Sequence, residues 1–330
     1  MRLVGSPDRH RAQPGAGSAS DRASQRSAAA ASRRLRENLW TTLFISPALL
    51  LYAGFVLLPI ALACYYSLYH WDGLGAVTDY IGLDNYARAL QDEVFQKAIV
   101  HNFTLVALSL VVQLPLGLGL ALLLNRRLRG RAAFRLVFFA PYVLSEVITA
   151  VVWLLMLQPD GLIDAIMRSL GLGGLVHLWL ADLRLVLYTM FVVITWKYLG
   201  FGIILFLAGL QGIPQELREA AAIDGANDLQ STRHVTLPLL GPTIRIWAFL
   251  AIIGSIQLFD LIWIMTLGGP ANSSNTMATY LIDRGFRRYQ FGYGNAAAVI
   301  LFAISLVFAI AYQRYVLRRD IDGALTRIVG

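Results

Sequence analysis

Three ionisable side chains lie within long apolar stretches of this 330-residue chain: Glu146, Lys197 and Asp260. A charge among apolar residues is costly, so such a residue is either paired or functional. Two interpretations stay open. Lys197 could form an internal ion pair with Glu146 or Asp260 that holds helices together, or the three could form a polar patch that binds the hydroxyls of a solute. Two acids and one base favour a neutral solute over an anionic one.

Aromatic side chains accompany these charges. Tyr142 precedes Glu146 by four residues, so the two would share one face of a helix. Trp196 and Tyr198 flank Lys197, and as direct neighbours Trp196 and Lys197 cannot both face the same point. Aromatic faces can cover the apolar C–H surface of a sugar ring while carboxylates accept from its hydroxyls. This combination therefore suits a carbohydrate.

A polar segment, 211–238, separates two of the apolar stretches. Its acidic first turn after a proline, with Glu216, is typical of a helix start, and Gly225 is typical of a helix end. We predict a short helix over about residues 215–224 with a small alanine surface. Leu237-Pro238 is expected to end a second short segment before the next apolar stretch. Taken alone, an amphipathic connector at the membrane surface would explain this segment equally well.

Nucleotide-binding and metal-binding motifs are missing. A P-loop needs Gly-Lys-Ser/Thr, and neither lysine of the chain, Lys97 or Lys197, follows a glycine. His-Glu-x-x-His does not occur, and the one cysteine, Cys64, excludes a Cys-based zinc site or an intrachain disulfide framework. We therefore predict no catalytic residue, no metal and no bound cofactor, and expect the chain not to be an enzyme.

The elements that must position these residues are long and apolar. Apolar residues make up 57% of the chain and charged residues 15%, against about 25% charged in a soluble domain. Six stretches reach the roughly 20 residues that a transmembrane helix needs. We expect neighbouring helices to satisfy the backbone groups that prolines free within them, and predict an all-α integral membrane protein. The six predicted spans are 39–68, 98–124, 132–157, 185–210, 239–267 and 293–315.

The distribution of basic residues predicts the orientation. With the N-terminus inside, 20 of the 28 Lys and Arg residues fall in inner segments and seven in outer loops, while Lys197 lies within a span. Basic residues concentrate on the cytoplasmic side of membrane proteins, so both termini and segment 211–238 are predicted to be cytoplasmic. We predict a disordered basic tail over 1–38, a six-helix membrane domain over 39–318 and a C-terminal tail over 319–330.

Segment 211–238 resembles the EAA motif of ABC importer permeases, with Val in place of the usual Ile. The matching elements are Glu219-Ala220-Ala221, Gly225 and, after nine residues, Val235-Thr236-Leu237-Pro238. The resemblance implies a cytoplasmic coupling-helix hairpin that docks into a cleft of a separate ATPase subunit. In this reading Glu219 is the polar contact and the alanines and Gly225 form a close-packing surface. The residues implied in coupling are Glu219, Ala220, Ala221, Asp224, Gly225, Leu237 and Pro238.

A second group of motifs is similar to the sugar-importer permeases of the maltose and glycerol-3-phosphate type. These motifs are Gly82-Leu83-Asp84-Asn85-Tyr86, Pro141-Tyr142, Ile223-Asp224-Gly225-Ala226 and the stretch from Phe259 through Gly268-Gly269-Pro270 to Tyr280. The resemblance covers about residues 40–318 and departs from the family pattern at Leu229 and Thr232, where Trp and Phe are common. It implies a heterodimer with a second permease in the bacterial cytoplasmic membrane, two ATPase subunits that use ATP, and an extracytoplasmic sugar-binding protein.

The resemblance also implies a substrate pathway at membrane depth, to which the fifth span contributes Ser255 and Gln257. With the residues introduced above, the predicted pathway is Tyr142, Glu146, Trp196, Lys197, Tyr198, Ser255, Gln257 and Asp260. A permease for another solute, such as glycerol phosphate or a polyamine, is one alternative. A secondary transporter is another, although it would not explain the hairpin.

Overall fold

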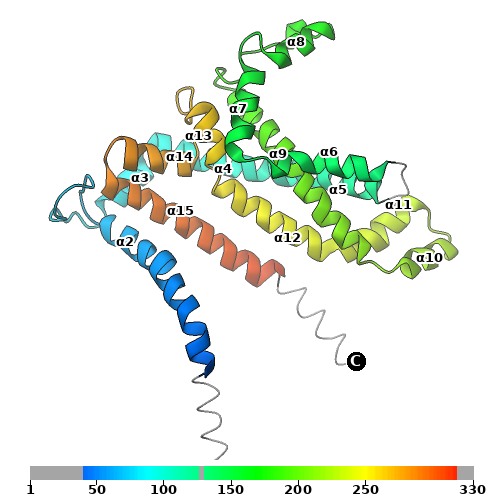
Figure 1. Cartoon of the computed structure of the whole chain (residues 1–330), viewed down its shortest axis with the longest axis horizontal. Coiled ribbons are helices and arrows are strands. Elements are labelled where there is room, and N and C mark those ends of the chain that lie inside the picture. Colours follow the sequence, from blue (N-terminus) through cyan, green and yellow to red (C-terminus); the bar gives the residue numbers. More distant parts are fainter. Residues whose placement is uncertain (1–39, 126–129, 318–330) are drawn as a thin grey trace, which may run out of the picture. The chain divides into compact units, whose positions relative to one another are not determined.

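A computed structural model describes residues 40–125 and 130–317, which are helical apart from turns and one isolated bridge between Tyr69 and Tyr80 (Figure 1). The chain divides into two units, 1–62 and 63–330, each considered by itself. The tails predicted at 1–38 and 319–330 lie outside the described residues. A 27-residue helix, Trp40–Tyr66, begins in the first unit and ends in the second; it includes η1 (Ala53–Leu57) and α2 (Leu58–Tyr66).

The second unit contains the candidate sites. In chain order its described helical segments are α3 (Asp84–Gln91), α4 (Glu93–Leu108), η2 (Ser109–Gln113), α5 (Leu114–Leu124), α6 (Arg131–Val143), α7 (Glu146–Leu157), α8 (Leu162–Ser169), η3 (Gly173–Leu175), α9 (Val186–Gln211), α10 (Gln215–Ile223), α11 (Asp228–Ser231), η4 (Thr232–Thr236), α12 (Leu237–Ile256), α13 (Asp260–Thr266), α14 (Met277–Ile282), η5 (Asp283–Arg287), α15 (Phe291–Tyr312) and η6 (Gln313–Leu317).

The predicted six-helix membrane fold is confirmed, but the third span is broken. Five described helices are long and apolar enough to cross a bilayer, and the sixth candidate is a pair, Ala133–Val143 and Glu146–Leu157, bent by 100°. Leu144 has extended backbone angles, and the Ser145 side chain accepts from the Ile148 N–H to start α7. The prediction of one continuous helix over 132–157 is therefore wrong, because a serine N-cap restarts the helix at this point.

The fifth span also differs from its prediction. Leu237-Pro238 does not end a separate segment but opens α12, and the candidate span runs from Asp228 to Thr266. The helix breaks instead at 257–259, between α12 and α13. Asn102 of α4, which is fully buried, closes this break: its Nδ2 donates to the carbonyls of Ser255 and Ile256, and its Oδ1 accepts from the Met277 N–H at the start of α14.

Proline explains why three of the helices widen into π-turns. Each of η1, η2 and η4 is followed directly by Leu-Pro, at Pro59, Pro115 and Pro238. A proline ring clashes with the carbonyl four residues earlier, and that carbonyl lies inside the π-turn in each case. The leucine N–H instead bonds five residues back, as from Leu237 to the Thr232 carbonyl. The wider turn makes room for the ring and lets the helix continue.

Helix α9 is the centre of the second unit. In its most apolar window 56% of the residues are buried, against 33% or less in each other continuous candidate span. Its Gly200 permits the closest approach: a Cβ there would lie 2.0 Å from the Phe138 carbonyl oxygen of α6. The bent third span is therefore packed backbone to backbone against α9.

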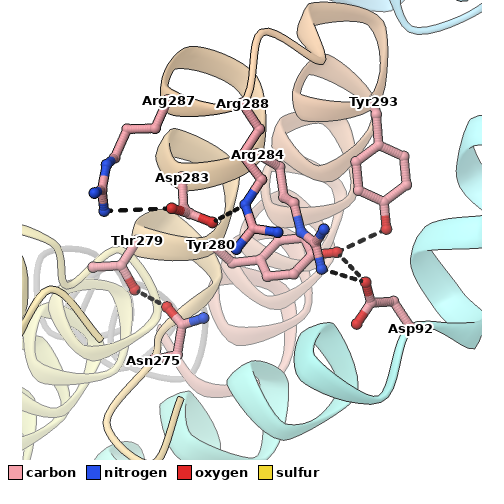
Figure 2. A network of polar contacts seen from close by, with 9 residues as sticks. All are labelled: Asp92, Asn275, Thr279, Tyr280, Asp283, Arg284, Arg287, Arg288 and Tyr293. Atoms are coloured by element: carbon pink, nitrogen blue, oxygen red, sulfur yellow. Dashed lines mark hydrogen bonds and ion pairs between the residues drawn. The ribbon is translucent and has the colours of Figure 1, made fainter. Parts of the chain in front are cut away.

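A polar network joins the start of α4 to α14 and η5 (Figure 2). The Asp92 carboxylate caps α4 by accepting from the Val94 N–H, and it also accepts from the Tyr280 hydroxyl at 2.7 Å and from Arg284 at 3.0 Å. Burial opposes ionisation of Asp92, but the bonds from Tyr280 and Val94 and the Arg284 charge lower its pKa below the ordinary value. The network therefore ties α4 to α14 and η5.

Candidate functional site: a central cavity and an exposed hairpin

A cavity of about 290 Å³ lies between α4–η2, α6, α9 and α12. This volume corresponds to roughly ten water molecules. Most of its wall is apolar, with Phe191, Phe201 and Trp247 as large aromatic surfaces. None of the described residues that line it is charged. The polar groups on the wall are Ser109, Gln113, Tyr142, Tyr198 and Ser255.

These polar groups differ in what they can offer a ligand. The Tyr198 hydroxyl donates to Glu146 Oε1 at 2.7 Å, so its oxygen is left as an acceptor. Ser109 and Ser255 contact each other through their hydroxyls at 3.3 Å. The Gln113 side chain is 4% exposed and makes no hydrogen bond within the described part of the chain. Its amide, with donors and an acceptor, is therefore available to a bound solute.

Lys197 is buried beside the cavity but is not part of its wall. Its ammonium group donates to the Leu144 carbonyl at 2.5 Å and lies 3.5 Å from the Pro141 carbonyl, at the C-terminal end of α6. It also pairs with Glu146 Oε1 at 3.6 Å, while Asp260 is exposed. Of the two ion pairs considered from the sequence, the structure contains the one with Glu146. Lys197 thus satisfies carbonyls at the C-terminal end of α6 that have no partner within the helix.

Three of the eight predicted pathway residues, Tyr142, Tyr198 and Ser255, line the cavity. Glu146 and Lys197 act on it only indirectly: Glu146 accepts from Tyr198, and Lys197 bonds the carbonyls of Pro141 and Leu144 on either side of Tyr142. Trp196 points elsewhere and packs edge-on against Trp153, with ring centroids 5.5 Å apart. Gln257 and Asp260 lie exposed at the break after α12. The predicted contact of these five residues with the cavity is therefore not seen. Helix breaks turn Glu146, Gln257 and Asp260 away, whereas Trp196 and Lys197 lie on other faces of the continuous helix α9.

Sequence reasoning missed Ser109 and Gln113. Both belong to the π-turn η2, which precedes Pro115, and the widened turn places both polar side chains on the cavity wall. π-turns within α-helices are frequent at functional sites. The Leu114-Pro115 pair was the available signal, because the same pair follows the π-turns at Pro59 and Pro238.

The hairpin between α9 and α12 forms the second candidate site, at the end of the bundle away from α13 (Figure 1). The predicted helix is confirmed as α10, and Gly225 ends it with a φ of +82°, a left-handed conformation that favours glycine. Asn227 and Gln230 then start α11 through a reciprocal capping box. Glu219 accepts from Gln215 at 2.7 Å.

The surface of this hairpin is uncovered and includes two large apolar side chains. Ile223 is 86% exposed and Leu229 76% exposed, while Ala220 and Ala222 of α10 are also exposed. Such large apolar side chains at a helix turn, outside the membrane-length segment of α9, are typical of a surface that another protein covers.

A helix bundle with an uncharged central cavity and an exposed helical hairpin defines a polytopic membrane transport protein. The chain belongs to the family of binding-protein-dependent transport system inner membrane components, whose profile matches residues 113–320. It is 34% identical over 282 residues to a probable ABC transporter permease protein of Pyrococcus horikoshii, covering 85% of this chain and 96% of the relative.

Two further similarities agree with this family. A multiple sugar-binding transport system permease protein of Streptococcus mutans is 34% identical over 272 residues, covering 82% of this chain and 93% of that protein. The fold matches a chain of the crystal structure of a bacterial alginate ABC transporter in complex with an alginate pentasaccharide-bound periplasmic protein. That match has a TM-score of 0.76 at 23% identity and covers 87% of this chain and 96% of the other.

Proposed function

We propose that this chain is the pore-forming permease subunit of an ATP-driven importer that carries a neutral sugar or oligosaccharide across the bacterial cytoplasmic membrane. The observation that carries the proposal is the α10–α11 hairpin, with its exposed Ile223 and Leu229, in a chain of this family. The hairpin provides the surface for a separate ATPase subunit. ATP is bound there, and this chain holds no cofactor of its own.

The cavity supports the substrate class. An anionic or cationic solute would require opposite charge on the wall, and the described lining residues are uncharged. Aromatic rings beside hydroxyl and amide groups suit a sugar, which presents apolar ring faces and many hydroxyls. The Streptococcus relative is named for sugar transport. These observations favour a neutral sugar over glycerol phosphate or a polyamine.

The remaining parts of the importer follow from the same proposal. The hairpin end faces the cytoplasm with both termini, and the end with α8 and α14 faces outward. A second, homologous permease completes the pore, two ATPase subunits drive it, and a binding protein outside the membrane delivers the sugar. The alginate transporter structure, which holds a sugar-loaded periplasmic protein, supports this last partner.

Substitution of Gly225 tests the coupling role. A Cβ at Gly225 would meet nothing within 4 Å in this chain, so Gly225→Asp changes the outer surface and adds only local backbone strain. We expect uptake to fall more than about tenfold and ATPase co-purification to weaken, at normal expression. Gly171→Asp is the matched control, since Gly171 has a φ of +76° and equal space but lies in the loop after α8. Full uptake in Gly225→Asp cells would refute the coupling assignment.

The substrate class is tested by uptake of labelled solutes into cells that lack the chromosomal copy. We expect the uptake of neutral oligosaccharides to depend on the chain. The uptake of glycerol phosphate and of polyamines should not depend on it. Chain-dependent uptake of a charged solute alone would replace the sugar assignment but leave the permease assignment intact.

A further inference from the structure

The break in the third span is held by a side chain of α9 that contacts both sides of the break. Lys197 of α9 binds the carbonyls of Leu144 and Pro141, which end α6, and pairs with Glu146, the first residue of α7. With 3% of its side chain exposed, Lys197 has no alternative partner in water. Lys197 and Glu146 together are called the clasp below.

Helix electrostatics explain why a lysine and a glutamate occupy these positions. The C-terminal end of a helix carries partial negative charge and the N-terminal end partial positive charge. Lys197 meets the negative end of α6, and Glu146 stands at the positive end of α7. Each charge therefore stabilises the helix end that it touches, and the two charges also attract each other. The 100° bend places both helix ends beside α9.

The clasp reaches the cavity through two tyrosines. Tyr142 lies two residues before Leu144 on the last turn of α6, and it stacks on Phe201 of α9 at 5.1 Å between centroids. Tyr198 donates its hydroxyl proton to Glu146 and so presents only an oxygen acceptor to the cavity. An acceptor in this place suits a solute hydroxyl, which can donate to it.

We propose that Lys197 and Glu146 are positioning residues for transport: they hold the bend of the third span and so orient Tyr142 and Tyr198 toward the cavity without contacting the solute. This inference rests on the proposed function in that the cavity is taken as the solute path. It assigns the buried Lys197 and the partly buried Glu146 a role different from the direct solute contact expected from the sequence.

A labelling experiment tests the positioning without any solute. In a Cys64→Ser background, Tyr142→Cys and Leu250→Cys are compared, since both residues line the cavity and are 36% and 43% exposed. Lys197→Met is expected to change the labelling rate of Tyr142→Cys by a small thiol reagent about fivefold or more, and that of Leu250→Cys by less than about twofold. Equal rates at Tyr142→Cys with and without Lys197→Met would overturn the proposal.

If Lys197→Met alone does not assemble, the double variant Glu146→Gln with Lys197→Met is labelled instead. It leaves no unpaired buried charge but still removes the donor to the Leu144 carbonyl. The same altered rate at Tyr142→Cys is expected, and an unaltered rate would overturn the proposal.

Transport kinetics separate positioning from solute contact. In the full transporter, Lys197→Met is expected to lower the maximal uptake rate about tenfold with apparent KM unchanged, and Lys197→Arg to restore it to within about threefold, because Arg keeps the charge. A raised KM at an unchanged rate would instead indicate direct solute contact. If the wild-type transporter carries no sugar, the proposed function fails, while the labelling comparison still decides the clasp.

Discussion

At the scale of single residues, the polar side chains on the cavity wall differ in their hydrogen-bond partners. Gln113 is buried, lines the cavity and makes no hydrogen bond within the described residues, whereas Tyr198 and Ser255 each have one. The Gln113 amide opens onto the cavity, so its donors and its acceptor can bond to a bound solute. The structure thus favours Gln113 as a solute-binding residue over the predicted Gln257, which is exposed at the break after α12.

Replacement of Gln113 by Leu should therefore reduce sugar uptake. The change keeps the volume of the side chain and removes its donors and acceptor, so we expect uptake to fall about tenfold, equivalent to roughly 1.4 kcal/mol, with unchanged assembly. Gln257→Leu is the matched control and should alter uptake less than about twofold. Labelled-sugar uptake at equal membrane expression measures both. Equal effects of the two variants would contradict the role of Gln113.

At the scale of helices, the sequence predicted which helices exist better than it predicted where they break. All six spans and the α10 helix with its Gly225 end were predictable from apolar length and from glycine and proline positions. The breaks at 144–145 and 257–259 were not, because the side chains that satisfy them, Lys197 and Asn102, come from other helices. Hydropathy depends on neighbours in the chain, so it carries no signal of such long-range contacts.

The Asp92 network gives a pH prediction at this scale. Because the folded-state pKa of Asp92 is below its unfolded value of about 3.8, the ionised carboxylate stabilises the fold above that pH, and the effect is lost as pH falls through the lowered folded-state pKa. Thermal unfolding in detergent at pH 7 should give the wild type a free energy of unfolding about 1 kcal/mol higher than that of Asp92→Asn. The difference should shrink steadily below about pH 5.

Asp283 provides the control for that prediction. It pairs with Arg287 and Arg288, whose side chains are 55% exposed, and lies beside the network in Figure 2. Exposed ion pairs contribute little to folding stability, so Asp283→Asn should lower the free energy of unfolding by less than about 1 kcal/mol. A stability difference between wild type and Asp92→Asn that does not change from pH 7 to pH 3 would contradict the assignment.

At the scale of the whole molecule, the two ends of the second unit differ in chemistry. The end with α10 presents the hairpin with its exposed Ile223 and Leu229, and the end with α14 presents the Asp92 and Asp283 networks. The distribution of basic residues predicts that the hairpin end faces the cytoplasm. Partner surfaces could be predicted only where a motif marks them, as at α10, since apolar residues facing lipid and those facing a partner have the same composition.

Cysteine labelling tests this orientation. In a Cys64→Ser background expressed without the ATPase subunits, so that the hairpin stays uncovered, Leu170→Cys, after α8, and Ile223→Cys, at the end of α10, place exposed thiols at opposite ends. A membrane-impermeant maleimide should label Leu170→Cys in intact cells and Ile223→Cys only in inside-out vesicles. Permeabilised cells, in which both should react, are the control. The reverse labelling pattern would show that the hairpin end faces outward and would contradict the predicted orientation.

The bent third span also has a consequence for biogenesis. Helices α6 and α7, with 13 and 12 residues, are each only about 20 Å long, too short to cross a hydrocarbon core of about 30 Å alone. The carbonyl of Leu144 finds its donor in Lys197, which is synthesised 53 residues later. The third span is therefore synthesised before the partner that closes its break, and we expect its final packing to follow the insertion of α9.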